Sequence, residues 1–280
     1  MASRILIDDL LNKYDYSVVQ TGNAKSQDKI GHEFKNVHDN QSWTTYMPSP
    51  KISNVFVTID FGEVVTFNGY AVRGHNMGTE HTSVRVLLRY STDDLGSQFT
   101  PSNLIDDTTF DFVESGTEEN QCFSTYFDQV SFRYLRIIFF GCTNKTAISN
   151  FRIGQWLQNV KISPQFPSLH YQGYTQETML NNDGKPMPSN VSKIPYNFKI
   201  NLNNLSEDDL NASTNISNDG RPFGQYLFDE IQEKPFFVML NDSDFHKESC
   251  VYCKIQKSTS PVFKSPTLMN WSIPVVGYYS

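Results

Sequence analysis

The stretch Val55–Tyr90 most constrains what this chain can fold into. It contains three runs rich in Val, Ile, Phe, Tyr and Thr, separated by glycines: Val55–Phe61, Val64–Val72 and Ser83–Tyr90. Residues of these types fit a pleated, half-buried surface. In the first run every second residue is apolar, which is the period of a strand with one buried face. The stretch therefore predicts three antiparallel strands.

The composition favours a β-rich protein that forms contacts over a helical enzyme. The chain has 280 residues, of which 38% are hydrophobic, 14% aromatic and 19% charged, enough for two ordinary domains or one large one. A net charge of -7 without a clustered Lys/Arg face predicts no nucleic-acid binding. No run approaches the ~20 apolar residues of a membrane span, and Asp8 and Asp9 lie where a secretory signal would be apolar. We therefore expect a soluble protein made in a cytosol, with free thiols.

The sequence pattern divides the chain near residue 158. Lys161–Ser168 contains two prolines and is typical of a linker, so we expect one domain over residues 1–158 and another over 159–280. Before it, Arg4–Leu11 fits either helical turns or an edge strand, Ser91–Thr109 is loop-like, and Arg133–Phe140 and Ile148–Trp156 are expected strands. 

The second part is also expected to be β-rich. A spacing of four between Phe223, Leu227 and Ile231 predicts one short helix within Gly220–Glu233. Further strands are expected at Pro195–Leu202, Pro235–Leu240, Ser249–Gln256 and Met269–Tyr279. Pro274 should place the last one at a sheet edge or give it a bulge.

Four short motifs in the first part resemble the discoidin-like, or galactose-binding-like, jelly-roll family. They are DNQSW at Asp39–Trp43, TIDFG at Thr58–Gly62, RYSTDD at Arg89–Asp94 and RYLRIIFFG at Arg133–Gly141. The resemblance covers about residues 20–157. It implies a mainly β fold, a discoidin-like jelly-roll β-sandwich followed by a second β-rich domain with one short helix.

Two further motifs indicate one particular form of this family. RGHNMG at Arg73–Gly78 and FRIGQWL at Phe151–Leu157 look like the form of the domain found in bacteriophage tail and baseplate proteins. The order YNFKINLNNLSEDD, LFDEIQEKPFFVML and NWSIPVVGYYS in the second part is similar to tail-hub and distal-tail-like modules. This resemblance implies a structural virion protein.

The sequence contains no recognisable catalytic motif. G-x-S-x-G, H-E-x-x-H, P-loop and G-x-G-x-x-G patterns are all missing, so we expect no enzyme and no cofactor. The acidic pair Asp106–Asp107 falls in the expected loop, which favours solvated charges over a glycosidase pair. Cys250-x-x-Cys253 lies in an expected strand, where an offset of three places the two thiols on opposite faces, so no metal site is expected. A structural Ca²⁺ at Asp39 and Asn40 is the alternative that relatives of the family offer.

Candidate contact residues come from the loops that the resemblance places at one end of the jelly roll. They are Tyr46, Arg73, His75 and Asn76. Family members that bind glycans or lipid headgroups use such loops. For His75 the alternative is a hydrogen bond that fixes the turn after it, and for Trp43 packing against the sandwich competes with sugar stacking.

Two functions remain open from the sequence. The first is a structural protein of a bacteriophage tail or baseplate, made in the host cytoplasm and held in the virion by other tail subunits, as a symmetric homo-oligomer. The alternative is a carbohydrate-binding adhesin that recognises a cell-surface polysaccharide through the loops of the first domain. An enzyme acting on glycosides ranks behind both.

Overall fold

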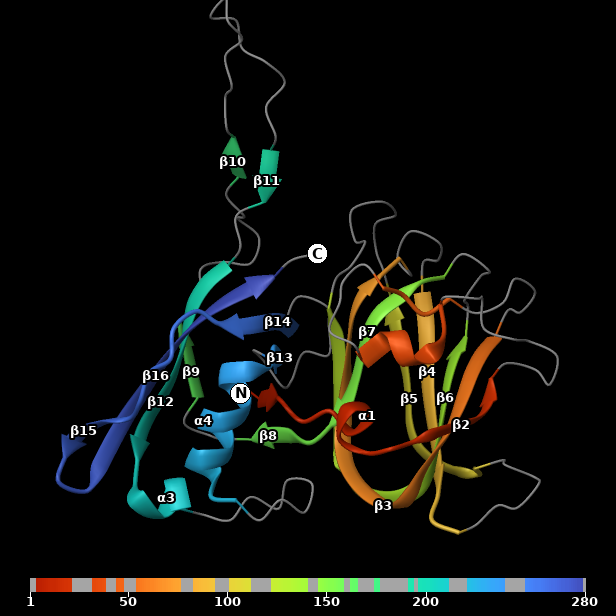
Figure 1. Ribbon diagram of the computed structural model, residues 1–280, viewed down its shortest axis with the longest axis horizontal. Helices are drawn as coiled ribbons and strands as arrows, with labels where there is room; N and C mark the ends of the chain where they lie inside the picture. Colours follow the sequence, from red (N-terminus) through yellow and green to blue (C-terminus); the bar gives the residue numbers. More distant parts are fainter. Residues whose placement is uncertain are drawn as a thin grey trace, which may run out of the picture.

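A computed structural model shows a mainly β protein made of two modules that lie side by side (Figure 1). It describes residues 4–21, 32–38, 44–47, 54–76, 83–93, 101–111, 122–140, 146–158, 162–165, 174–176, 191–193, 196–211, 221–239 and 250–278. Within these ranges no helix is both long and apolar enough to span a membrane. The expected mainly β class is confirmed.

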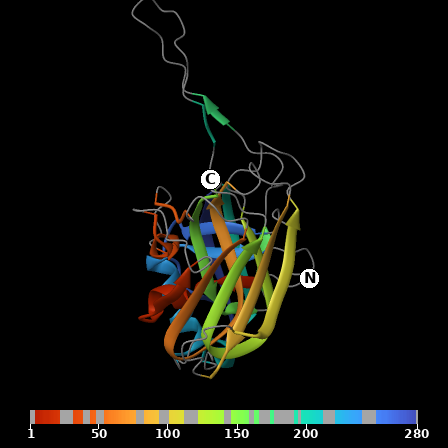
Figure 2. The same ribbon diagram turned by 90° about the vertical axis from the view of Figure 1, so that its right-hand side faces the viewer.

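The first module is one six-stranded antiparallel sheet in the order β2-β3-β6-β4-β5, with β7 paired to the second half of β3. Its strands are β2 (Ser17–Thr21), β3 (Asn54–His75), β4 (Ser83–Ser91), β5 (Asn103–Asp111), β6 (Phe123–Phe140) and β7 (Ile148–Gly154). Two short helices accompany them, α1 (Leu10–Lys13) and η1 (Phe34–His38). Figure 2 views this module in front of the second one.

β3 and β6 pair along almost their whole length and bend together, so each of them contributes to both layers of a sandwich (Figure 1). The ladder shifts register between Asp60 and Val65, next to Gly62, whose φ of 73° suits glycine. The two strands expected on either side of Gly62 are therefore one bent strand. Phe139 of β6 and Phe151 of β7 pack across the sandwich with ring centroids 5.8 Å apart.

Three of the four motifs that carried the family resemblance lie next to one another in this sheet, and the fourth, DNQSW, lies outside the described residues. Thr58 and Asp60 of TIDFG pair with Arg136 and Tyr134 of RYLRI, and Arg136 also pairs with Arg89 of β4. Arg133 donates to both carboxylate oxygens of Asp60, at 2.8 and 3.0 Å. The motif residues thus form one contiguous block of strand pairing, which explains why they occur together. 

The second module is an eight-stranded sheet in the order β8-β1-β13-β14-β16-β12-β9, with β15 paired to β16. Its strands are β1 (Arg4–Leu6), β8 (Trp156–Gln158), β9 (Ile162–Gln165), β12 (Tyr196–Leu205), β13 (Phe236–Met239), β14 (Cys250–Ile255), β15 (Val262–Ser265) and β16 (Leu268–Tyr278). The helices α3 (Glu207–Asn211) and α4 (Phe223–Glu233) accompany it, and β10 (Tyr174–Gln176) pairs with β11 (Val191–Lys193) as a separate hairpin. The helix expected around Phe223 and Ile231 is confirmed.

Both faces of β13 in the second sheet are buried, and alternate residues face opposite ways. In β13, Phe236 and Val238 pack with Leu227 of α4, whereas Phe237 and Met239 pack against the first module. The second group includes Trp156, whose indole nitrogen donates to the Thr125 carbonyl at 2.9 Å. The modules therefore share an apolar interface instead of being joined only by a linker.

The sheets do not divide the chain at residue 158. β1 pairs with β8 on one side and with β13 on the other, so Arg4–Leu6 lies in the second sheet. Arg4–Leu11 contains a strand followed by the start of α1, so both expected types occur, but the strand lies inside the sheet and not at its edge. The expected linker Lys161–Ser168 contains β9, which pairs with β12 despite Pro164, so that expectation was wrong where the structure describes it.

Two other expectations need correction. Ser91–Thr109 is not all loop, because β5 pairs with β4 from Asn103 onwards. Asp107 on β5 forms an ion pair with Arg85 of β4, and this cross-strand partner offsets the poor strand propensity of aspartate. Pro274 lies in β16, between β12 and β14, and not at a sheet edge, and its register with β12 is regular on both sides, without a bulge.

Candidate functional site

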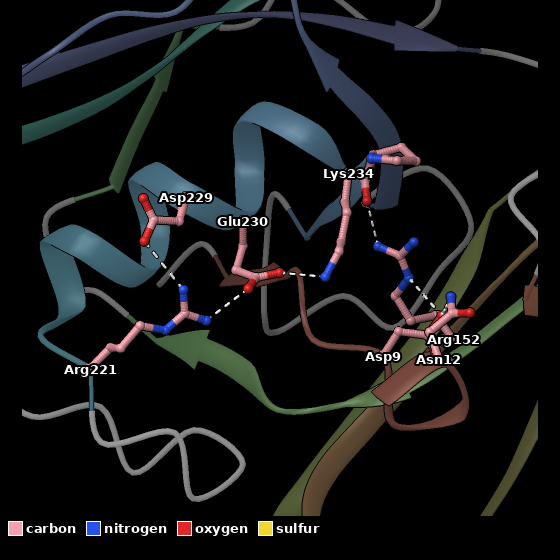
Figure 3. Close-up of polar contacts among 8 residues, drawn as sticks. Asp9, Asn12, Arg152, Arg221, Asp229, Glu230 and Lys234 are labelled. Carbon is pink, nitrogen blue, oxygen red and sulfur yellow. Dashed lines mark hydrogen bonds and ion pairs between the residues drawn. The ribbon is translucent and has the colours of Figure 1, made fainter. Parts of the chain in front are cut away.

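A cleft of about 180 Å³ lies where the two modules meet, between α1 and β7 on one side and α4 on the other (Figure 3). Most of its lining is charged or polar. The lining residues are Ile7, Asp8, Asp9, Asn12, Lys13, Arg152, Arg221, Tyr226, Glu230 and Lys234. Pockets at domain interfaces with convergent polar groups are the usual place for a ligand site.

Arg152 is the residue that connects the two sides of the cleft. It belongs to β7, in which every residue is buried, and its side chain is 1% exposed. Its Nε lies 3.7 Å from Oδ2 of Asp9, and its Nη1 donates to the carbonyl oxygen of Pro235, just before β13 (Figure 3). The guanidinium also lies over the ring of Phe237, 5.6 Å from its centroid. One buried cation therefore contacts α1's N-terminus and the second module.

The carboxylate of Asp9 lies beside the guanidinium of Arg152 and also caps the N-terminus of α1. Its carboxylate accepts from the backbone N–H of Leu11 at 3.2 Å and from Nδ2 of Asn12 at 2.8 Å, which is the usual role of an N-cap aspartate. Burial raises the pKa of Asp9 to about 6, with neighbouring Asp8 acting in the same direction and Arg152 opposing both. Asp9 is therefore mostly ionised at neutral pH and titrates close to it.

A second charged group lies on the α4 side. Glu230 accepts from Nη2 of Arg221 at 2.8 Å and from Nζ of Lys234 at 2.7 Å, and Arg221 also reaches Asp229 at 3.3 Å (Figure 3). Burial raises the pKa of Glu230, but the hydrogen bonds from Lys234 and Arg221 outweigh burial and hold that pKa below its ordinary value. Each of these carboxylates thus has a cation beside it, and an ionised carboxylate accepts hydrogen bonds from a polar ligand.

Two of the four contact residues expected from the sequence are buried. Tyr46 is 1% exposed; its backbone pairs with Ile148 and its ring packs against Phe34 at 5.4 Å. His75 is also 1% exposed and packs against Phe123 at 5.0 Å. Both side chains lie inside the sandwich, where they support the loop end of the module and present no surface to a ligand.

The other two expected contact residues lie nearer the surface. The guanidinium of Arg73 is half-buried over the ring of Tyr252 in the second module, 4.4 Å from its centroid. Asn76 accepts from the backbone N–H of Ala147 at 2.7 Å. The structure does not bring the four side chains into one open site, and a contact role for Arg73 and Asn76 stays a prediction. Asp39, Asn40 and Trp43 lie outside the described residues.

The thiols and acidic groups show no metal arrangement in the described part of the chain. Cys250 faces the first module and Cys253 faces α4, so the expectation that the pair lies on opposite faces is confirmed. Burial raises the pKa of both thiols well above its ordinary value. Among the described residues no three His, Cys, Asp or Glu side chains group closely enough to hold a metal ion.

No sequence pattern predicted the cleft. Asp8 and Asp9 are two acidic residues near the start of the chain, and Arg152 is one residue of an expected strand. The available indication was a charge in FRIGQW, a run otherwise suited to a fully buried strand. A buried arginine requires a partner.

No model of a protein family and no curated protein matches the chain. Solved structures do match part of it. A carbohydrate-binding module of family 32 from AlyQ, in complex with 4,5-unsaturated mannuronic acid, is 20% identical with a TM-score of 0.35, over 49% of this chain and 95% of that one. A pectin-binding carbohydrate-binding module is 17% identical with a TM-score of 0.35, over 50% and 91%.

A third match is to a much longer protein. The family 29 fucosidase of Ruminococcus gnavus, in complex with fucose, is 15% identical with a TM-score of 0.36, over 52% of this chain and 26% of the fucosidase. This chain therefore spans about a quarter of the length of that enzyme. The three likenesses concern fold, over about half of this chain.

Proposed function

We propose that this chain is a carbohydrate-binding protein and that the cleft between its modules holds one sugar residue. The observation that carries the proposal is the lining of the cleft, which places donors from Lys13, Arg221 and Lys234 beside acceptors from Asp8 and Glu230. Sugar hydroxyl groups donate and accept at once, so they need both kinds of partner.

The size of the cleft supports a small ligand. At about 180 Å³ it is smaller than the ~300–1,000 Å³ of pockets for drug-sized molecules, which suits one sugar ring at the end or side of a polysaccharide. The family that the motifs resemble includes glycan-binding members, and the AlyQ and pectin-binding modules are named for carbohydrate ligands. The proposal rests on the cleft of this chain and not on that likeness.

A glycan array followed by titration calorimetry on the full chain tests this function. We expect saturable binding to a defined glycan that Lys13→Ala and Lys234→Ala weaken and that Lys264→Ala, on β15, leaves unchanged. If Arg73→Ala abolishes binding and the cleft variants do not, the chain is still a carbohydrate-binding protein, but its sugar site lies at the loop end. A folded chain that binds no glycan on the array would overturn the function itself.

We also propose that the chain binds without catalysing a reaction. The carboxylates of buried Asp9 and half-buried Glu230 in the cleft are each held by a cation, whereas glycoside hydrolysis needs a protonated acid and a free carboxylate. A reducing-end assay on whichever glycan binds should show no release over a long incubation. Release that a substitution in the cleft abolishes would establish an enzyme.

The second candidate is the structural role in a bacteriophage tail or baseplate, in which case the chain would be located in the virion. The observation that favours a protein contact is the open edge of β15, with its exposed Val262 and Phe263. Mass spectrometry of purified particles that carry this chain should find it at a fixed ratio to other tail subunits. Its absence from such particles would exclude this role.

A further inference from the structure

β15 is an edge strand of the second sheet. It pairs antiparallel with the start of β16, Val262 opposite Asn270 and Phe263 opposite Met269, and with no other strand that the structure describes. Figure 1 shows this hairpin at the far left, away from the first module. A strand with one partner leaves a row of backbone N–H and C=O groups for another strand.

The side chains of β15 are unusually apolar for an open edge. Val262 is 67% and Phe263 70% exposed, the highest values among the large apolar side chains in the described ranges. Phe263 lies opposite Met269, which belongs to the core under α4. Phe263 therefore continues an apolar face beyond the point where this chain covers it.

The direction of these two side chains narrows the class of partner. Consecutive residues of a strand point to opposite faces of a sheet, so Val262 and Phe263 point away from one another. A sugar ring or a membrane surface could cover only one of them. A strand added at the edge lies beside both and also pairs the free backbone groups.

The charge of the chain around β15 narrows the class of partner further. From residue 250 to residue 280 the chain has three lysines, Lys254, Lys257 and Lys264, and no acidic residue, although its net charge is -7. All three lysines are exposed, and Lys264 donates to the neutral side chain of Asn204 at 3.0 Å. 

A second copy of the chain fits this edge poorly. Twofold pairing of β15 with itself would bring Lys264 of one copy towards Lys264 of the other, and like charges across a strand pair are destabilising. An acidic segment instead would complement the lysines. 

We propose that β15 docks an extended acidic segment of a partner protein, with alternating apolar side chains, as an additional strand of the second sheet. The inference rests on the second candidate function, for which it names the partner's chemistry. The partner's apolar residues would lie beside Val262 and Phe263, and its carboxylates near Lys257 and Lys264.

Fluorescence anisotropy with labelled peptides of about seven residues tests the docking on the full chain. The probes are a peptide alternating Asp and Val, a block peptide of the same composition, and an alternating Lys and Val peptide. We expect only the first to bind, less tightly as salt is raised, and about tenfold less tightly to Lys264→Glu and to Phe263→Ser. Val64→Ser, on an exposed site of β3, is the matched control.

Several outcomes would overturn the inference. They are equal binding of all three peptides, no binding of the alternating acidic peptide, or no effect of Lys264→Glu and Phe263→Ser. Self-association that Phe263→Ser abolishes, seen by sedimentation of the chain alone, would make a second copy the occupant and also refute it. None of these results bears on whether the chain is present in particles, so failure of the docking and failure of the assembly role remain separable.

Discussion

Replacing Arg152 with methionine should destabilise the fold more than any single surface change. The variant leaves the carboxylate of Asp9 buried with the backbone of Leu11 and the amide of Asn12 as partners, and it removes the donor to the Pro235 carbonyl. Removing one partner of a buried ion pair costs about 3–5 kcal/mol, of which the unsatisfied carbonyl accounts for about 1–3 kcal/mol. We expect a loss of about 4 kcal/mol at neutral pH.

Urea unfolding followed by tryptophan fluorescence measures this loss. Trp156 lies at the interface between the modules and Trp271 in the core of the second, so both report on the affected region. Arg85→Met, which breaks the more exposed pair with Asp107, is the matched control and should lower the midpoint far less than Arg152→Met does.

A double-mutant cycle separates the ion pair from the packing of the arginine stem. Asp9→Asn combined with Arg152→Met should cost clearly less than the sum of the two single changes, because no buried charge is then left alone. An Arg152→Met variant within about 1 kcal/mol of the parent, or additive single changes, would refute the conclusion that this contact holds the modules together.

Three other predictions follow from the same structure. The pKa of Asp9 rises from 3.8 to about 6 on folding, so the folded protein binds this proton more tightly and its stability falls as pH rises from about 4 to about 6. Relative to Asp9→Asn, urea unfolding should show a loss of about 3 kcal/mol over that window. Parallel pH profiles of the parent and the variant would contradict this prediction. Gly69→Ala should cost at least about 1–3 kcal/mol in the same assay, since a Cβ there would lie 2.4 Å from a carbonyl oxygen of the neighbouring strand; an unchanged midpoint would show that the strands shift freely. The buried thiols of Cys122, Cys250 and Cys253, whose pKa values are raised by burial, should resist iodoacetamide in the native protein and react in guanidinium chloride, as peptide mass spectrometry would show; native labelling would place them at the surface.

Local periodicity predicted the elements of this fold well. The alternation at Val55–Phe61 and the spacing of Phe223 and Leu227 each gave the right type of structure, because these residues face one core with a regular period. The strand β5 was not predicted, because Asp106 and Asp107 resemble loop residues. Asp107 is instead stabilised by Arg85 on the next strand, and Asp106 by the hydroxyl of Tyr70, neither of which is a neighbour in sequence.

Long-range pairing is what the sequence could not show. Ile5 pairs with Val238, and the short apolar run around Ile5 gives no indication of which distant strand it joins. The cleft depends on the same pairing, because it brings Asp9 next to Arg152 and α4. The expected contact residues Tyr46 and His75 came from a loop pattern that does not distinguish a side chain pointing outward from one pointing into the core.

The position of β1 between β8 and β13 has a consequence for how the protein is made and cut. Arg4–Leu6 leaves the ribosome long before Phe236–Met239, its partner on one side, so the second sheet cannot close until nearly the whole chain has been synthesised. A fragment ending at residue 158 would retain β1 and β8 but lack β13, exposing an apolar edge that invites aggregation. Separating the halves therefore calls for one cut after Leu6 and another before Trp156, with β1 joined to the C-terminal part by circular permutation.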